Sequence, residues 1–173
     1  LKSFNQHLTN VIGHKMLVEA FECTEDGDYS TALNLYDLAL KQEPANVDAL
    51  VDKGATLQNM GRNKLAIRSY NKALSISPDN FNALLNKGAA LHSDQKYLQA
   101  IECYDAVLKI DKKCTMALAY KGLSLGEMNQ LHDAIQHFKK ALSIDKHYDL
   151  ANISKDLAQD LLKSIKIQKT KTP

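Results

Sequence analysis

A chain of 173 residues with 45% hydrophobic and 24% charged side chains has the size and composition of one domain. Its 7 Gly and 3 Pro are too few for the many tight turns of a β-sandwich or barrel, so we expect an all-α fold. The chain has no run of 18 apolar residues and a formal net charge of only +2, so we expect no membrane span and no strong attraction to nucleic acid.

Two features of the chain bear on its compartment. No basic segment followed by an apolar core opens the sequence, which predicts the absence of a secretory signal, although a start at Leu1 rather than Met is compatible with a mature form or an excised fragment. The cysteines are odd in number and lack C-x-x-C spacing, which indicates free thiols at Cys23, Cys103 and Cys114 rather than disulfides or a zinc site. Free thiols predict a reducing, cytoplasmic environment.

The first expected element is an N-terminal amphipathic segment over residues 1–12. Leu1, Phe4, Leu8 and Val11 recur there at helical spacing. Such a segment extends the following helix, caps the rest of the fold or docks into another molecule, and the sequence leaves these three roles open.

A 34-residue period follows and divides residues 13–148 into four units. The units span residues 13–46, 47–80, 81–114 and 115–148. Three register positions carry the period, namely an alanine (Ala32, Ala66, Ala100, Ala134), an aromatic ring (Tyr36, Tyr70, Tyr104, Phe138) and a small residue (Ala20, Gly54, Gly88, Gly122).

Each unit is expected to contain two helices. In residues 47–80, apolar and small side chains recur at three- and four-residue steps on both sides of an interruption at Gly61. Pro78 ends the second helix, and Asp79 and Asn80 offer side-chain oxygens that cap the next one. Residues suited to a left-handed C-cap are expected in the inner turn of each unit, where Gln95 fits that conformation least: Gly27, Gly61, Gln95 and Asn129.

The small residues predict a close approach between the two helices of a unit. We expect Gly54 and Ala66 to let the helices cross tightly, and Tyr70 to pack between this unit and the next. A glycine within a helix costs up to about 1 kcal/mol relative to alanine. Its recurrence therefore indicates that the close approach of the two helices stabilises the fold by more than this cost.

These motifs resemble the tetratricopeptide repeat, whose pattern reads W-x₂-L-G-x₂-Y, then A-x₃-F, then P. Residues 47–80 match it as Leu50-x₂-Lys53-Gly54-x₂-Leu57, then Ala66-x₃-Tyr70, then Pro78. The resemblance covers residues 13–148, with no Trp anywhere and with Lys112 and Lys146 in place of Pro at the last two repeat ends. It implies an α-solenoid, a right-handed superhelix of antiparallel helix pairs.

A capping helix is expected over residues 149–166. It would cover the apolar face of the last repeat with a stripe of five side chains and turn a polar face to solvent. Residues 167–173 are expected to form a basic tail. The stripe consists of Leu150, Ile153, Leu157, Leu161 and Ile165.

The resemblance also implies a binding surface, because the first helix of each pair lines a concave groove in proteins with this repeat. By register, the groove positions here form four sets: His14, Asp48, Asn82 and Met116; Leu17, Val51, Leu85 and Ala119; Val18, Asp52, Asn86 and Tyr120; Phe21, Ala55, Ala89 and Leu123. Two interpretations stay open for each apolar position, namely packing against the neighbouring first helix and contact with a ligand. For the surface as a whole we expect binding of an amphipathic helix or an extended peptide.

A chaperone C-terminal carboxylate is not the expected ligand. Members of the family that bind it hold it with Lys, Asn and Arg on three successive first helices. Only one Asn is suitably placed here, no cation is, and Asp48 and Asp52 would repel an anion. Nucleic acid is not expected for the same reason, because readers of single strands need a basic groove.

Catalysis has no motif to support it. The sequence contains no H-E-x-x-H, phosphate-binding glycine loop or nucleophile elbow, and repeat geometry suggests no Ser or Cys partner for His92. We therefore expect no enzyme activity, no cofactor and no metal site.

The predicted function is thus an adaptor that binds another polypeptide in the concave groove. The alternative is a self-assembling scaffold, in which the N-terminal segment or the C-terminal helix of one copy fills the groove of another.

Overall fold

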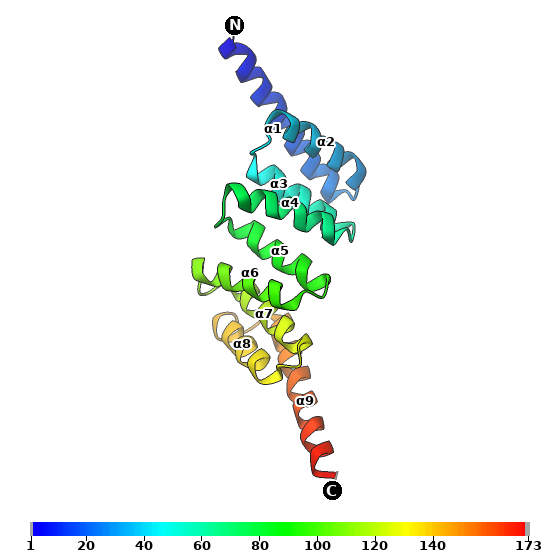
Figure 1. Cartoon of the computed structure of the whole chain (residues 1–173), viewed down its shortest axis with the longest axis vertical. Helices are drawn as coiled ribbons and strands as arrows, with labels where there is room; N and C mark the ends of the chain where they lie inside the picture. Colours follow the sequence, from blue (N-terminus) through cyan, green and yellow to red (C-terminus); the bar gives the residue numbers. More distant parts are fainter. Residues whose placement is uncertain (1, 172–173) are drawn as a thin grey trace. The chain divides into compact units, whose positions relative to one another are not determined.

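The computed structural model describes the backbone of residues 2–171 and the side chains of residues 11–164. All regular structure in this range is α-helical (Figure 1). The helices are α1 (Lys2–Glu25), α2 (Tyr29–Gln42), α3 (Val47–Asn59), α4 (Asn63–Ile76), α5 (Phe81–Ser93), α6 (Tyr97–Ile110), α7 (Thr115–Glu127), α8 (Leu131–Ile144) and α9 (Asp149–Lys171).

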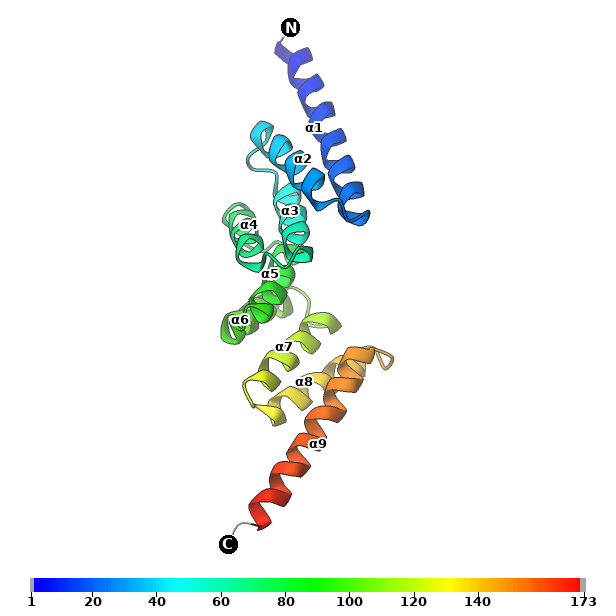
Figure 2. The ribbon, with the colours of Figure 1, turned by 90° about the vertical axis from the view of Figure 1, so that its right-hand side faces the viewer.

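The helices form two compact units, Leu1–Ala90 and Leu91–Pro173. In the first unit α1 packs against α2, α2 against α3, and α3 against α4. In the second unit α6 packs against α7, α7 against α8, and α8 against α9 (Figure 2). Consecutive helices are therefore the main packing partners, as expected for a chain of helix pairs.

The N-terminal segment is not a separate element, because α1 continues without a break from Lys2 to Glu25. The backbone of residues 2–12 extends the first helix of the first repeat, which is one of the three roles that the sequence left open. Leu1 and the side chains of Phe4 and Leu8 lie outside the described residues.

The inner turns adopt the left-handed conformation at all four expected positions. The backbone φ angle is +82° at Gly27 and +71° at Gly61, and it is +59° at both Gln95 and Asn129. Gln95 thus adopts the conformation although its residue type is poorly suited to it. The turn is imposed by the helices that it joins.

The outer turns do not depend on proline. α4, α6 and α8 end at Ile76, Ile110 and Ile144, which share one register position, although only the first is followed by a proline. The side chain of Asn80 accepts a hydrogen bond from Ala83 N at 2.8 Å, so the predicted cap of the following helix is confirmed.

The recurring aromatic rings form the centre of the packing. Tyr36, Tyr70, Tyr104 and Phe138 are all fully buried. A Cβ atom built on Gly54 would lie 2.4 Å from Cε1 of Tyr70, and one on Gly122 would lie 2.6 Å from Cε1 of Phe138. The space left by the glycine is therefore filled by the aromatic ring of its own repeat.

The C-terminal helix packs with a different face from the predicted one. Ala151 and Ala158 are buried against the last repeat, whereas Ile153, Leu157 and Leu161 are 68%, 62% and 47% exposed. The alanines lie seven residues apart on one side of α9, and their small side chains allow close approach to the preceding helices. The prediction of a buried Ile153–Leu157–Leu161 stripe was wrong for this reason.

The outcome differs for Leu150, for Ile165 and for the predicted tail. Leu150 is partly buried against the last repeat, as expected, and the side chain of Ile165 lies outside the described residues. The helical backbone also continues to Lys171, past residue 166 and into the segment expected to be a tail.

Candidate functional site

The predicted groove residues separate into exposed and buried groups. Val51, Leu85 and Ala119 are buried, so they pack in the interior and offer no surface to a ligand. Leu17 is partly buried and packs against two core clusters of the unit Leu1–Ala90, one of which contains Val51. For this set, the burial of the side chains favours the interpretation as packing residues.

The other three sets remain at the surface. In the unit Leu1–Ala90 we call their members the first-helix strip, and in the other unit Met116, Tyr120 and Leu123 of α7 are exposed or half-buried. The first-helix strip consists of His14, Val18, Phe21, Asp48, Asp52, Ala55, Asn82, Asn86 and Ala89.

A pair of buried hydroxyls holds the first two helices of the strip together. Thr24 of α1 and Thr56 of α3 have their Oγ1 atoms 2.9 Å apart. Each hydroxyl also lies 2.9 Å from a carbonyl oxygen of its own helix, that of Ala20 or Asp52. Because both threonines are buried, this contact fixes the spacing of α1 and α3 and places their exposed side chains on one face.

The strip combines exposed apolar groups with unpaired acids. Val18 and Phe21 of α1 are 46% and 52% exposed. Burial raises the pKa of Asp52, and the nearby Asp48 carboxylate raises it further. Neither acid makes an ion pair with any described residue. A cation next to Asp52 would therefore relieve an unfavourable concentration of negative charge.

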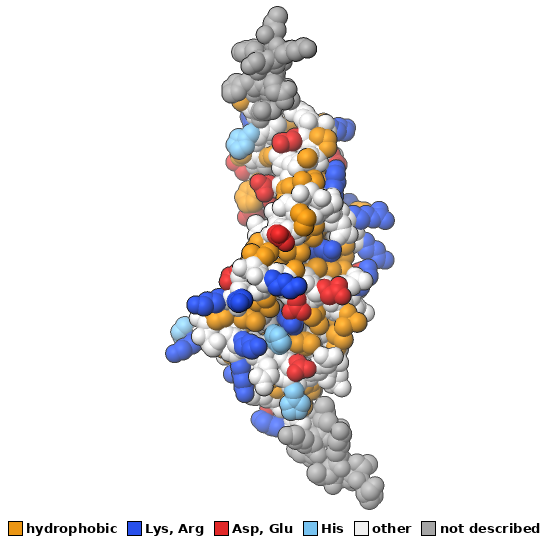
Figure 3. All heavy atoms as spheres, turned by 60° about the vertical axis from the view of Figure 1, so that its left-hand side comes forward, with side chains coloured by type: hydrophobic (Ala, Val, Ile, Leu, Met, Phe, Trp, Pro, Cys, Tyr) orange, Lys and Arg blue, Asp and Glu red, His pale blue; other side chains and the backbone are white. Residues whose placement is uncertain are grey.

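Acidic and hydrophobic side chains also lie next to each other on the face shown in Figure 3. Below the grey N-terminal atoms in Figure 3, red acidic side chains are interspersed among orange hydrophobic ones.

His92 has a serine partner that repeat geometry did not suggest. Its Nδ1 atom lies 2.9 Å from Oγ of Ser124, and the expectation of no such partner was wrong. The two residues are 32 positions apart, the same separation as Thr24 and Thr56, so the pair is the equivalent tie between α5 and α7. Ser124 is fully buried within a helix and offers no nucleophile to a substrate.

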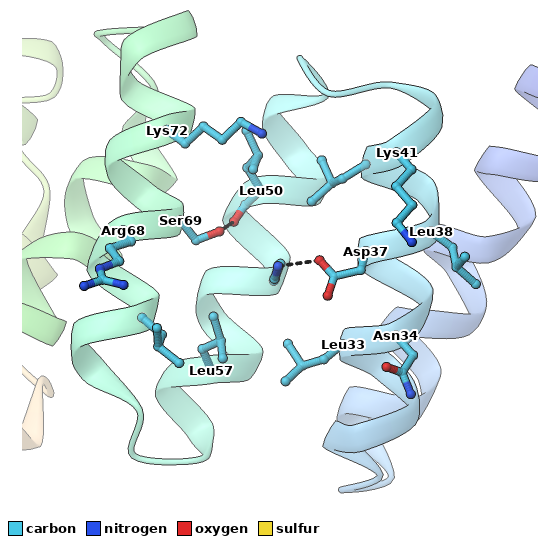
Figure 4. A pocket seen from close by; sticks show the side chains of 13 residues that line it. Leu33, Asn34, Asp37, Leu38, Lys41, Leu50, Leu57, Arg68, Ser69 and Lys72 are labelled. Carbon is cyan, nitrogen blue, oxygen red and sulfur yellow. Dashed lines mark hydrogen bonds and ion pairs between the residues drawn. The ribbon is translucent and has the colours of Figure 1, made fainter.

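The structure also contains a depression that sequence analysis missed. It lies between α2 and α4, above side chains of α3, and encloses about 890 Å³ (Figure 4). We call it the second-helix groove. The repeat register predicted a binding surface only on first helices. The sequence signal for this groove was the presence of Lys41, Arg68 and Lys72 on second helices without acidic partners.

The described residues contain neither a metal-binding cluster nor a membrane-spanning helix. No group of three or more His, Cys, Asp or Glu side chains there is arranged to hold a metal ion. No helix in that part of the chain is both long and apolar enough to cross a bilayer.

Comparison with known proteins identifies the repeat. A family model described as TPR repeat matches residues 59–95, and one described as tetratricopeptide repeat matches residues 81–114 and 117–148. No curated protein sequence gives a significant match.

Solved structures share the fold at low sequence identity. A MamA protein has 23% identity and a TM-score of 0.79 over 86% of this chain and 81% of its own. MamA residues 41 to the end from Desulfovibrio magneticus RS-1 have 22% identity and a TM-score of 0.74, with 93% and 97% covered. A tetratricopeptide repeat protein from Parabacteroides merdae ATCC 43184 has 21% identity and a TM-score of 0.79, with 88% and 60% covered. These likenesses establish an all-α helical-repeat solenoid.

Proposed function

Because this chain belongs to the tetratricopeptide-repeat family, whose members are typically non-enzymatic interaction scaffolds, we propose that it binds a positively charged amphipathic segment of another protein along its first-helix strip. The family and the fold support a protein-interaction scaffold in general. The choice of surface and ligand is our proposal.

One observation carries the proposal, namely the exposed Val18 and Phe21 on a strip that also holds the unpaired acids Asp48 and Asp52. Apolar anchors of a ligand would cover Phe21, and its Lys or Arg side chains would neutralise the two carboxylates. An amphipathic helix presents both groups on adjacent faces, which is the usual way for a helix to bind a helical surface. An extended peptide would instead use the amides of Asn82 and Asn86.

A pair of designed peptides tests this assignment. Both have about 18 residues, which span about 27 Å as a helix, and both carry leucines at every third or fourth position. One has lysines at the remaining positions and the other has glutamates. We expect the lysine peptide to bind, with affinity weakened about threefold to tenfold by Asp52→Asn or Phe21→Ser in fluorescence anisotropy.

Matched controls lie outside the strip. Asp79→Asn removes one exposed carboxylate, and Leu98→Ser removes one exposed apolar side chain; both should leave the affinity unchanged. Equal affinity of the lysine peptide for wild type, Asp52→Asn and Phe21→Ser would rule out the strip as its site.

Self-assembly is the second candidate, and the exposed face of α9 favours it. Ile153, Leu157 and Leu161 form an apolar stripe at four-residue spacing that no described part of the chain covers. A second copy would bury this stripe, and Leu157→Glu would then lower the concentration-dependent mass measured by light scattering. A wild-type chain that stays monomeric at high concentration would exclude this candidate.

A further inference from the structure

The second-helix groove is open, elongated along two helices and floored by leucines. Leu33 of α2 and Leu57 of α3 point into the space between α2 and α4 (Figure 4). Its volume of about 890 Å³ lies in the range of pockets that bind ligands specifically. The groove therefore has room for several side chains of a partner.

Exposed leucines form opposite rims of this groove. Leu38 on α2 and Leu65 on α4 are 44% and 42% exposed, although both are large apolar side chains. Apolar side chains gathered around a concave surface are characteristic of binding sites. A ligand with apolar side chains would bury both rims and the leucines between them.

The charges around the groove are mostly positive. Lys53 is neutralised, because its Nζ lies 2.5 Å from Oδ1 of Asp37. Lys41, Arg68 and Lys72 make no ion pair with any described residue. Three cationic side chains thus remain for a ligand, and Lys41 and Lys72 lie toward the same end of the groove (Figure 4).

This charge pattern is not a general property of the repeat. One repeat later, the register positions of Lys41 and Arg68 are occupied by Ser75 and Glu102. Two repeats later, Lys109 and Lys140 occupy the positions of Lys41 and Lys72, and Gln136 occupies that of Arg68, so the combination of three cations occurs once among these repeats. The leucine at the position of Leu40 recurs as Leu74.

From these observations we propose that the second-helix groove is a separate docking site for an acidic amphipathic helix of a partner protein. The leucine floor requires apolar anchors, which excludes a purely ionic ligand. The three free cations require carboxylates beside those anchors. A helix fits because its ridge of side chains lies in the groove between two neighbouring helices.

The proposal is independent of the first-helix strip and has the opposite charge preference. Asp48 and Asp52 would repel the acidic ligand, and Lys41, Arg68 and Lys72 would repel the basic one. Unit Leu1–Ala90 would then hold two partners of opposite charge at two distinct surfaces.

The glutamate–leucine peptide described above is the probe, with fluorescence anisotropy as the measurement and the full chain as the receptor. We expect Lys41→Glu/Lys72→Glu to weaken its binding about tenfold or more. The control is Lys112→Glu/Lys113→Glu, which makes the same change in net charge at exposed lysines in the turn between α6 and α7 and should leave binding unchanged. Circular dichroism checks that all variants keep their helicity.

Three outcomes would overturn the proposal. Equal loss of affinity in both double variants would show attraction to net charge alone. Equal binding of a glutamate peptide without leucines would show that the apolar floor contributes nothing. Stronger binding to phosphatidylserine vesicles than to the peptide, lost in Lys41→Glu/Lys72→Glu, would show that the groove is a lipid site. If Lys41→Glu/Lys72→Glu still binds the lysine–leucine peptide, the proposal for the first-helix strip stands independently of this one.

Discussion

Gly122 and Gly126 lie one turn apart on α7 and have opposite surroundings. A Cβ on Gly122 would lie 2.6 Å from the Phe138 ring, whereas one on Gly126 would have only Cβ of Ala134 nearby, at 4.0 Å. We expect Gly122→Ala to lower the free energy of unfolding by about 1–2 kcal/mol, since overpacking outweighs the gain in helix propensity. Gly126→Ala should raise it by up to about 1 kcal/mol. Urea denaturation measures both, and effects of the same sign would contradict the role of the ring.

His92 makes the stability of the fold depend on pH. Burial lowers its pKa below the ordinary value of 6.5, against a smaller opposite effect of Glu127. The unfolded chain therefore binds a proton at a higher pH than the folded chain does, and stability is lost as pH falls below about 6.5. We expect the free energy of unfolding to decrease between about pH 7 and pH 5, and His92→Gln to reduce this decrease. His137, whose pKa burial also lowers, contributes in the same direction, and Asp52, whose pKa is raised, contributes in the opposite direction. Identical slopes in wild type and His92→Gln would contradict the prediction.

At one register position, the residue that caps the following helix differs between repeats. Substitutions there therefore measure how much a cap stabilises its helix. Asn46 and Asn80 accept hydrogen bonds from Ala49 N and Ala83 N at 2.9 and 2.8 Å. Their counterpart Cys114 offers only a sulfur atom, 3.4 Å from Ala117 N, and sulfur is a weak acceptor. Cys114→Asn should therefore stabilise the protein by about 0.5–1 kcal/mol, and Asn80→Ala should destabilise it by about 1 kcal/mol. The two changes are compared by thermal unfolding, where a lower midpoint for Cys114→Asn would refute the explanation.

At the level of single helices, α9 shows that helical spacing in a sequence does not by itself decide which face is buried. Both Leu157 and Ala158 belong to stripes with helical spacing, and the larger side chain was expected to be the buried one. The structure buries Ala158 and exposes Leu157, because helices approach each other most closely at small side chains. Hydrophobicity alone ranks the two faces in the wrong order.

For the whole molecule, division into two compact units predicts a local response to core substitutions. In repeat proteins, stability is approximately a sum of repeat and nearest-neighbour contributions. Gly54→Ala should lower amide hydrogen-exchange protection mainly in α1–α4, and Gly122→Ala mainly in α7–α9. Equal loss of protection throughout the chain in either variant would show that the two units unfold as one.

The 34-residue period by itself determined the helical pairs, their turns and the family, because each depends on local spacing. The inner turns at Gly27 and Gly61 and the cap at Asn80 follow from neighbouring residues alone. It also predicted the candidate groove positions, nine of which form the exposed or half-buried first-helix strip. Tertiary structure decided what depends on contacts between helices. It buried Val51, Leu85 and Ala119, paired His92 with Ser124 and exposed the outer face of α9. It also opened a groove between α2 and α4, whose shape depends on how closely the two helices pack.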